Sequence, residues 1–171
     1  TLFIYSAVQG KNKLSGVFAM LCLAMTIYTV FYGFELRQKN EYMIMFCLKL
    51  EYFGTAFIPP LWFLLAYKYH FPKTENIKHK VMIFMIPVIT LIMVNTNEYH
   101  YLFYKNVSVF FEDGAYVAKL DKGIWYVVAS IYSYGCLFAG QFVFLKSWIV
   151  SKGKRKKQSK LLFIGSLFPM I

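Results

Sequence analysis

Glu51 is the residue whose chemistry stands out, because its carboxyl group lies within the long apolar run Tyr42–Tyr69. A charged side chain at membrane depth costs at least about 2.5–3.5 kcal/mol, so such residues usually face the interior of a helix bundle. Gly54 shares the helix face of Glu51 and favours close packing against another helix. Glu51 is therefore a candidate ligand or proton site. The alternative is a structural hydrogen-bond partner for another helix, for example Tyr132 or Gln141.

Lys49 places a second charge in the same run. Residues two apart on a helix diverge by about 200°, so Lys49 is not expected to pair with Glu51. Its long apolar stem allows the ammonium group to reach outward to the membrane surface. We therefore expect only Glu51 to point into the bundle.

A polar cluster, Asn95-Thr96-Asn97 and His100, follows the apolar run Val81–Thr96. Asn and Thr are common helix terminators, which is one interpretation of the cluster. The other is a polar pocket floor that faces outward, with Asn97 and His100 as candidate ligand contacts. His100 has no Cys or carboxylate partner at metal-ligand spacing, so a metal is not expected, but its imidazole could respond to external pH.

The run Ile124–Ile149 adds two further candidate ligand contacts, Trp125 and Tyr132. A tyrosine hydroxyl at membrane depth needs a hydrogen-bond partner, although core packing also explains many such aromatic residues. The three cysteines lie in apolar runs and are interpreted as buried thiols. We find no catalytic motif and no phosphate-binding glycine loop in the sequence, and no cofactor is expected.

Prolines interrupt two of the apolar runs and are candidate hinges. Pro59 and Pro60 each lack a backbone N–H and are expected to kink Tyr42–Tyr69, and Pro87 is expected to bend the next run. A bilayer tolerates such a break only where neighbouring groups satisfy the freed carbonyls.

The elements that position these residues are membrane-spanning helices. Hydrophobic residues make up 58% of the chain and aromatic residues 20%, which is more apolar surface than a soluble domain of 171 residues can hide. We expect an all-α integral membrane bundle with at least five to six spans visible. The expected spans are Leu2–Val8 (the end of a first span), Leu14–Phe34, Tyr42–Tyr69, Val81–Thr96, Ile124–Ile149 and Leu161–Ile171 (the start of a sixth).

Positive charge alternates between the connections of these spans. Segments 11–13, 68–80 and 146–160 carry net charges of +2, +3 and +7, whereas 35–41 is neutral and 98–122 carries −1. This series is typical of the positive-inside rule. It predicts a multi-pass protein of the plasma membrane with its N-terminus outside. The basic residues lie in connections rather than along one groove, so the formal net charge of +11 indicates anionic lipid and not nucleic acid.

The outer connection 97–122 is expected to contain a small β-hairpin. Residues 106–111 and 115–120 alternate loosely, and Asp113-Gly114 between them is a strong turn signal. The hairpin could cover the mouth of the bundle as a lid, or it could simply join two spans.

Three blocks of sequence resemble one known family. They are LEYFG with PPLWF (50–54 and 59–63), IPVITL with NTNEYH (86–91 and 95–100), and GIWY with IYSY (123–126 and 131–134). In this order and spacing they resemble the seven-helix N-terminal sensor region of bacterial membrane histidine kinases, a module also found ahead of diguanylate cyclases. The resemblance implies that residues 1–171 form a single sensor domain, truncated at both ends. It implies a seventh helix and a cytoplasmic effector after Ile171, with a homodimeric kinase that signals to a response regulator.

The expected function is detection of an extracellular or membrane-borne small molecule or peptide, transmitted inward as a helix rearrangement. A small transporter or ion-coupled carrier is the alternative, because proline-broken helices and an intramembrane carboxylate occur in such proteins. Against it, the visible halves show no internal repeat and only one deep acid. An integral-membrane enzyme is disfavoured because no catalytic set is present.

Overall fold

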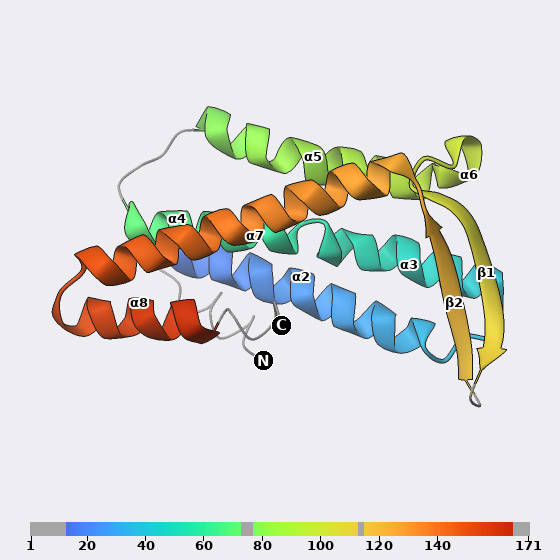
Figure 1. Ribbon diagram of the computed structural model, residues 1–171, viewed down its shortest axis with the longest axis horizontal. Coiled ribbons are helices and arrows are strands. Elements are labelled where there is room, and N and C mark those ends of the chain that lie inside the picture. Colours follow the sequence, from blue (N-terminus) through green and yellow to red (C-terminus); the bar gives the residue numbers. More distant parts are fainter. Residues whose placement is uncertain (1–12, 73–76, 113–114, 166–171) are drawn as a thin grey trace.

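A computed structural model describes residues 13–72, 77–112 and 115–165 as a helical bundle with one two-stranded sheet (Figure 1). The elements in order are α2 (Lys13–Glu35), α3 (Glu41–Thr55), α4 (Ile58–His70), α5 (Ile77–Asn95), α6 (Asn97–His100), β1 (Tyr104–Glu112), β2 (Ala115–Lys122), α7 (Ile124–Val150) and α8 (Gly153–Gly165). The predicted class, an all-α membrane bundle with a small hairpin, is confirmed.

Three segments of the described chain are long and apolar enough to cross a membrane: Leu14–Glu35, Glu41–His70 and Ile124–Val150. A shorter apolar helix, Val81–Asn95, corresponds to the short fourth span expected from the sequence. The expected first span, Leu2–Val8, lies outside the described residues, as does the end of the sixth. The structure therefore supports three full spans and one short apolar helix within the described chain.

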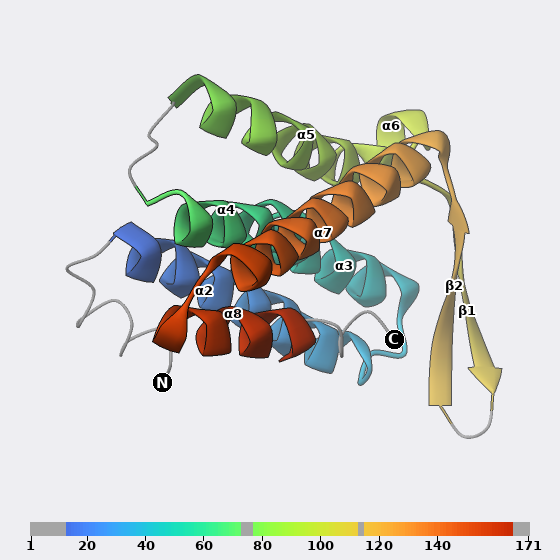
Figure 2. The same cartoon turned by 60° about the vertical axis from the view of Figure 1, so that its left-hand side comes forward.

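The connections between helices fall into two groups at opposite ends of the bundle (Figure 1). The α2–α3 connection, α6 and the hairpin lie at one end, which we call the cap end. The C-terminus of α4, the N-terminus of α5 and the α7–α8 turn lie at the other, which we call the basic end. Figure 2 shows α7 running from α6 and the hairpin toward α8, and it contacts α4, α5 and α8. The basic segments around residues 68 and 146–160 thus share one end, as the charge series predicts.

The long run predicted as one kinked span is two helices. α3 ends at Thr55 and α4 begins at Ile58, so the break comes before the prolines rather than at them. Pro59 and Pro60 lie in the first turn of α4, where backbone N–H groups have no acceptor within the helix. Across the break, the N–H of Phe57 donates to the Gly54 carbonyl at 3.0 Å. The two prolines therefore cost the chain no helical hydrogen bond.

α2 and α3 cross very closely at Gly54. A Cβ atom built there would lie 2.3 Å from the Ala24 carbonyl oxygen and 2.8 Å from the Tyr28 nitrogen, both of which are backbone atoms. Only glycine allows this approach, because a backbone cannot rotate away as a side chain can. The small residue noted at this helix face therefore fixes the contact between the two helices.

Helix α8 begins earlier than expected. The segment 146–160 was predicted to be a loop, but α8 starts at Gly153 and includes the basic residues that follow. Lys, Arg and Gln favour helix, which explains why a charged segment continues as one. Gly153 adopts a φ of +59° at the turn, a conformation that suits glycine. Ser147 of α7 and Ser159 of α8 are both fully buried, with their hydroxyl oxygens 3.2 Å apart.

The apolar core is divided into two clusters. At the basic end, Val17, Leu21 and Ala24 of α2 pack with leucines 61, 64 and 65 of α4. At the cap end, Val94, Phe103, Tyr104 and Val107 pack together, and Trp125 and Tyr126 of α7 pack against them. The bundle thus has a separate core for each end.

The predicted hairpin is confirmed. β1 and β2 pair antiparallel from Tyr104↔Lys122 to Glu112↔Ala115, with an irregularity between Tyr104 and Asn106. The predicted turn, Asp113-Gly114, lies outside the described residues. Buried Val107 anchors the first strand in the cap-end core. The hairpin therefore lies across that end of the bundle (Figure 1).

Candidate functional site

A cavity of about 500 Å³ adjoins the cap-end core, and Phe103, Tyr126 and Ala129 of that core contribute to its lining. Its walls come from α2, α3, α5 and α7, and Phe103 lines it on the cap side. Aromatic rings and small hydroxyl side chains line most of it: Tyr28, Tyr52, Thr55, Ala56, Pro87, Thr90, Phe103, Tyr126, Ala129, Ser130, Tyr132, Ser133, Tyr134 and Leu137. Such a mixture of apolar walls with a few polar groups is typical of small-molecule sites.

The cavity borders both proline-containing regions. Ala56 belongs to the break between α3 and α4, and Pro87 lies inside α5. Pro87 has no N–H to donate to the carbonyl of Ile83, four residues earlier. The hydroxyl of Tyr132 on α7 donates to this same carbonyl. Tyr132 therefore supplies the hydrogen bond that the proline removes, and it joins α7 to α5 at the cavity wall.

Trp125 lies next to the cavity rather than in its wall. Its indole Nε1 donates to the Thr90 hydroxyl of α5 at 3.2 Å, and Thr90 is itself a lining residue. The ring packs against the cap-end core. Trp125 and Tyr132 thus attach α7 to α5 at two levels of the same cavity.

Glu51 is buried in α3 with 5% of its surface exposed, and its Oε1 atom has no hydrogen-bond partner among the described residues. Its side chain meets that of Glu35, at the end of α2. The hydroxyl of Tyr132, one of the partners suggested from the sequence, donates to the Ile83 carbonyl of α5. A carboxylate only accepts hydrogen bonds, so a bond between the two acids needs a proton on one of them.

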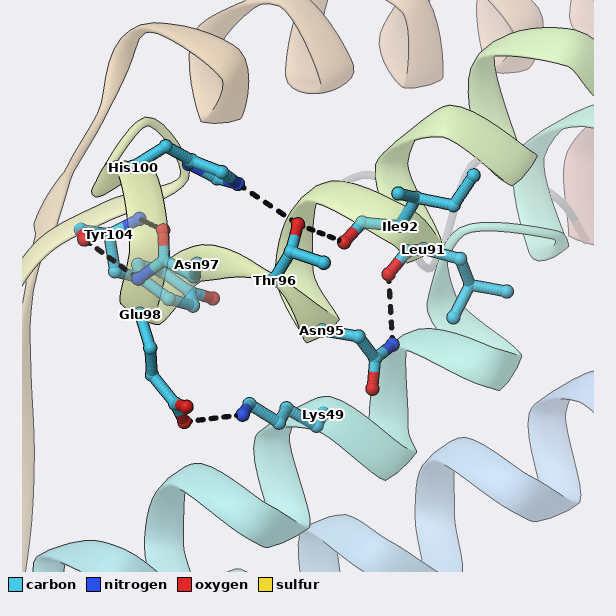
Figure 3. Close-up of polar contacts among 9 residues, drawn as sticks. All are labelled: Lys49, Leu91, Ile92, Asn95, Thr96, Asn97, Glu98, His100 and Tyr104. Atoms are coloured by element: carbon cyan, nitrogen blue, oxygen red, sulfur yellow. Dashed lines mark hydrogen bonds and ion pairs between the residues drawn. The ribbon is translucent and has the colours of Figure 1, made fainter.

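Asn97 organises the chain where α6 leads into β1 (Figure 3). Its Oδ1 accepts from the backbone N–H groups of Phe103 and Tyr104, both at 3.0 Å, and its Nδ2 donates to the Tyr104 carbonyl at 2.9 Å. The side chain is 3% exposed. Asn97 therefore fixes the backbone of Phe103, which lines the cavity.

Tyr104 is buried beside Asn97 and contacts the second tyrosine of this region. Its hydroxyl lies 3.1 Å from that of Tyr52, a cavity-lining residue of α3. Burial, and then the neighbouring Tyr52, raise the pKa of Tyr104 far above the usual tyrosine range. This hydroxyl therefore stays neutral and can donate a hydrogen bond to Tyr52.

His100 is bonded within its own turn of chain. Its Nδ1 accepts from the N–H of Leu102 at 3.0 Å, and its Nε2 lies 3.1 Å from the Thr96 hydroxyl (Figure 3). That hydroxyl donates to the Ile92 carbonyl, so it must accept from His100. The contacts select the neutral Nε2–H tautomer. A second proton on Nδ1 would oppose the Leu102 N–H.

The side chain of Lys49 extends to the cap end, in the outward direction that the sequence predicts. Its ammonium nitrogen lies 2.6 Å from Glu98 Oε1 of α6, and Glu98 is largely exposed (Figure 3). The pair joins α3 to α6 away from Glu51. The described residues contain no group of three or more metal-ligating side chains, and their cysteines are free.

Comparison with protein-family models matches residues 1–171 to the N-terminal 7TM region of histidine kinase. The chain belongs to this family. Searches among curated proteins and among solved structures gave no match. The resemblance noted in the sequence is thus confirmed, and the 7TM region gives the cavity its context, the sensor portion of a kinase.

Within this 7TM region, the structure separates the five candidate residues. Trp125 and Tyr132 lie at the cavity, Glu51 lies beside it next to Tyr52, and Asn97 and His100 lie in the cap above it. Sequence reasoning missed Glu35, because it was assigned to a connection. It also missed Tyr28 and Tyr52, although tyrosine at membrane depth was a usable signal.

Proposed function

We propose that this chain is the membrane sensor of a bacterial two-component histidine kinase, and that its ligand is a small molecule or part of a peptide bound in the aromatic cavity. The observation that carries the proposal is the position of the cavity between the α3–α4 break and Pro87. A ligand at this position contacts both places where the helices are interrupted. It can therefore change the angle between the helices at those interruptions.

Tyr132 couples the ligand to the helices. Its hydroxyl bonds the Ile83 carbonyl, so a ligand group that displaces it alters how α5 bends at Pro87. Binding shifts the population between two bundle arrangements in proportion to the difference in affinity. The hinges in this proposal are the break at Ala56–Phe57, just before Pro59 and Pro60, and the bend at Pro87.

The other candidate residues have different roles. Trp125 and Tyr132 contact the ligand or set the shape of its cavity, and Glu51 with Glu35 supplies the acidic edge. Asn97 and His100 position the Phe103 roof rather than touching the ligand. The hairpin, tied to the core by Val107, limits access from outside.

The signal passes to a cytoplasmic kinase that works as a homodimer and phosphorylates a response regulator. The basic end of the bundle faces the cytoplasm and the N-terminus lies outside, as the charge series favours. Reporter fusions after Lys78 and Lys156 should register as cytoplasmic, and a fusion after Lys39 as external. External activity at either of the first two sites contradicts this orientation.

Filling the cavity tests the proposal in the full-length kinase. Ser133→Trp places a large ring in the cavity wall, whereas Ile131→Trp, at a position 69% exposed, places it toward lipid. We expect Ser133→Trp to change basal output of a response-regulator-controlled reporter several-fold and to abolish its further modulation. Ile131→Trp is the matched control and should behave as wild type. If both variants signal normally at normal expression, the cavity is not the sensing site.

A further inference from the structure

A second concave site lies at the basic end of the bundle, far from the aromatic cavity. It is a groove of about 660 Å³ between α2, α4, α7 and α8. Its walls are mainly apolar, with Phe18, Trp62, Leu65, Phe144, Leu161 and Leu162 among them. Three polar side chains, Ser15, Tyr69 and Gln158, also line it.

The first turns of α8 add positive charge to one edge of this groove. Residues three, four and seven apart share a helix face. Lys154 precedes Gln158 by four positions and Leu161 by seven, and Lys157 precedes Leu161 by four. Both lysines are exposed. Both lysines therefore lie on the face of α8 that lines the groove, about one helical turn before Gln158 and Leu161.

Two other cations of α8, Arg155 and Lys160, make contacts of their own. Arg155 donates to the Tyr69 carbonyl at 2.6 Å, and its guanidinium lies 5.5 Å from the centre of the Tyr69 ring. Lys160 lies 5.8 Å above the Trp148 ring of α7. Segment 146–160 contains no acidic residue that could neutralise Lys154 and Lys157. These two lysines are thus placed to bind an external anion.

We propose that this groove binds an anionic phospholipid of the cytoplasmic leaflet, with an acyl chain along the apolar wall and the headgroup phosphate at Lys154 and Lys157. Charge complementarity selects this occupant. A helix from a second copy would bring its own basic end to the same surface, because all copies share one orientation, and the cations would repel. An anionic lipid matches both the apolar wall and the charge.

Bound lipid would connect α8 to α2 and α4, because the groove has walls from all three helices. The lipid would therefore steady α8 against α2 and α4, whatever occupies the aromatic cavity. The site depends on membrane residence and not on the proposed ligand.

Lipid retention by the purified full-length protein tests this site. Native mass spectrometry in mild detergent, with phosphatidylglycerol or phosphatidylcholine added in a titration, measures the affinity of each lipid. We expect at least one tightly held phosphatidylglycerol in the wild type. Lys154→Gln with Lys157→Gln should weaken it by roughly 25-fold, since each lysine near an anionic lipid surface contributes about a fivefold effect. Phosphatidylcholine should be held weakly by all variants.

Matched variants distinguish a specific lipid site from general electrostatic attraction between anionic lipid and the basic residues. Lys152→Gln with Lys156→Gln removes the same charge away from the groove and should leave phosphatidylglycerol binding unchanged. Leu161→Trp blocks the acyl path and should weaken binding with every lysine present. Equal loss from both lysine pairs, or equal retention of both lipids, overturns the proposal. So does binding unaffected by both the Lys154/Lys157 pair and Leu161→Trp, which would mean that protein fills the groove.

Discussion

The cap and the aromatic cavity use polar groups in opposite ways. In the cap, Asn97 makes three hydrogen bonds to the backbone, and both ring nitrogens of His100 have partners. Beside the cavity, Glu51 Oε1 has no partner among the described residues, and several hydroxyl groups line an open volume. Polar side chains of the cap are thus held in structural contacts. In the proposed function, a ligand would meet the polar groups next to the cavity.

The largest effect is expected from removing the centre of the cap. Asn97→Ala leaves two backbone N–H groups and one carbonyl unpaired in a buried place, which should cost about 2–4 kcal/mol of stability. Thermal unfolding of the purified protein in detergent measures this. Asn95→Ala is the control, because Asn95 is exposed and bonds only the Leu91 carbonyl of its own helix. Equal stability of the two variants would show that the buried Asn97 contributes no more to the fold than the exposed Asn95.

A smaller effect is expected at the cavity wall. Tyr132→Phe leaves the Ile83 carbonyl without a donor, which should cost about 1–2 kcal/mol, in the range measured for hydrogen bonds between membrane helices. Pro87→Ala restores the N–H of residue 87 and should make the Tyr132 hydroxyl dispensable. A double-mutant cycle on unfolding midpoints checks this coupling. If Tyr132→Phe costs the same stability with and without Pro87→Ala, the hydroxyl does not replace the missing donor.

Glu51→Gln sharpens the distinction between structure and signal. The amide keeps the shape of the side chain and removes the charge, so stability should change by less than about 1 kcal/mol. Kinase output in cells should change several-fold, because the acidic edge beside the cavity is lost. Glu41→Gln, an exposed substitution in the first turn of α3, is the charge-matched control. A normal dose response in the Glu51→Gln variant would show that Glu51 has a packing role and no role in signalling.

The smallest effect is expected at the α3–α4 break. Pro59→Ala restores an N–H in the first turn of α4, where no helical acceptor exists, so stability should change by less than about 0.5 kcal/mol. The unfolding midpoint measures this change. Pro87→Ala is the contrasting variant, because Pro87 lies in the interior of α5. A loss at Pro59 as large as that at Tyr132 would show that the prolines themselves hold the break.

Much of the fold follows from sequence because membrane residence limits the choices. Apolar runs gave the helix ranges to within a few residues for α2 and α7, and alternation around Asp113-Gly114 gave the hairpin. The sequence also marked both halves of the Tyr132–Ile83 bond: a carbonyl freed by Pro87 and a deep hydroxyl in need of a partner. It could not pair them, since that requires the rotation of α7 relative to α5.

The site was harder to predict for a similar reason. Asn97 and Glu51 are both polar residues at the border of apolar runs, and composition alone does not tell a satisfied amide from an unpaired carboxyl oxygen. Glu35 was overlooked because a connecting segment was expected at residues 35–41, whereas α2 continues to include it. Helix α8 was missed because charge was taken to indicate a loop.

The contact at Gly54 has a mechanical consequence. Because the backbones of α2 and α3 touch there, neither helix can slide along the other without a collision of main-chain atoms. The two are expected to move as a rigid pair, and the bend at Ala56–Phe57 is where that pair can tilt against α4. A stimulus at the cap end would then reach the basic end as an angular displacement of two helices together, rather than as a shift of one helix along its axis.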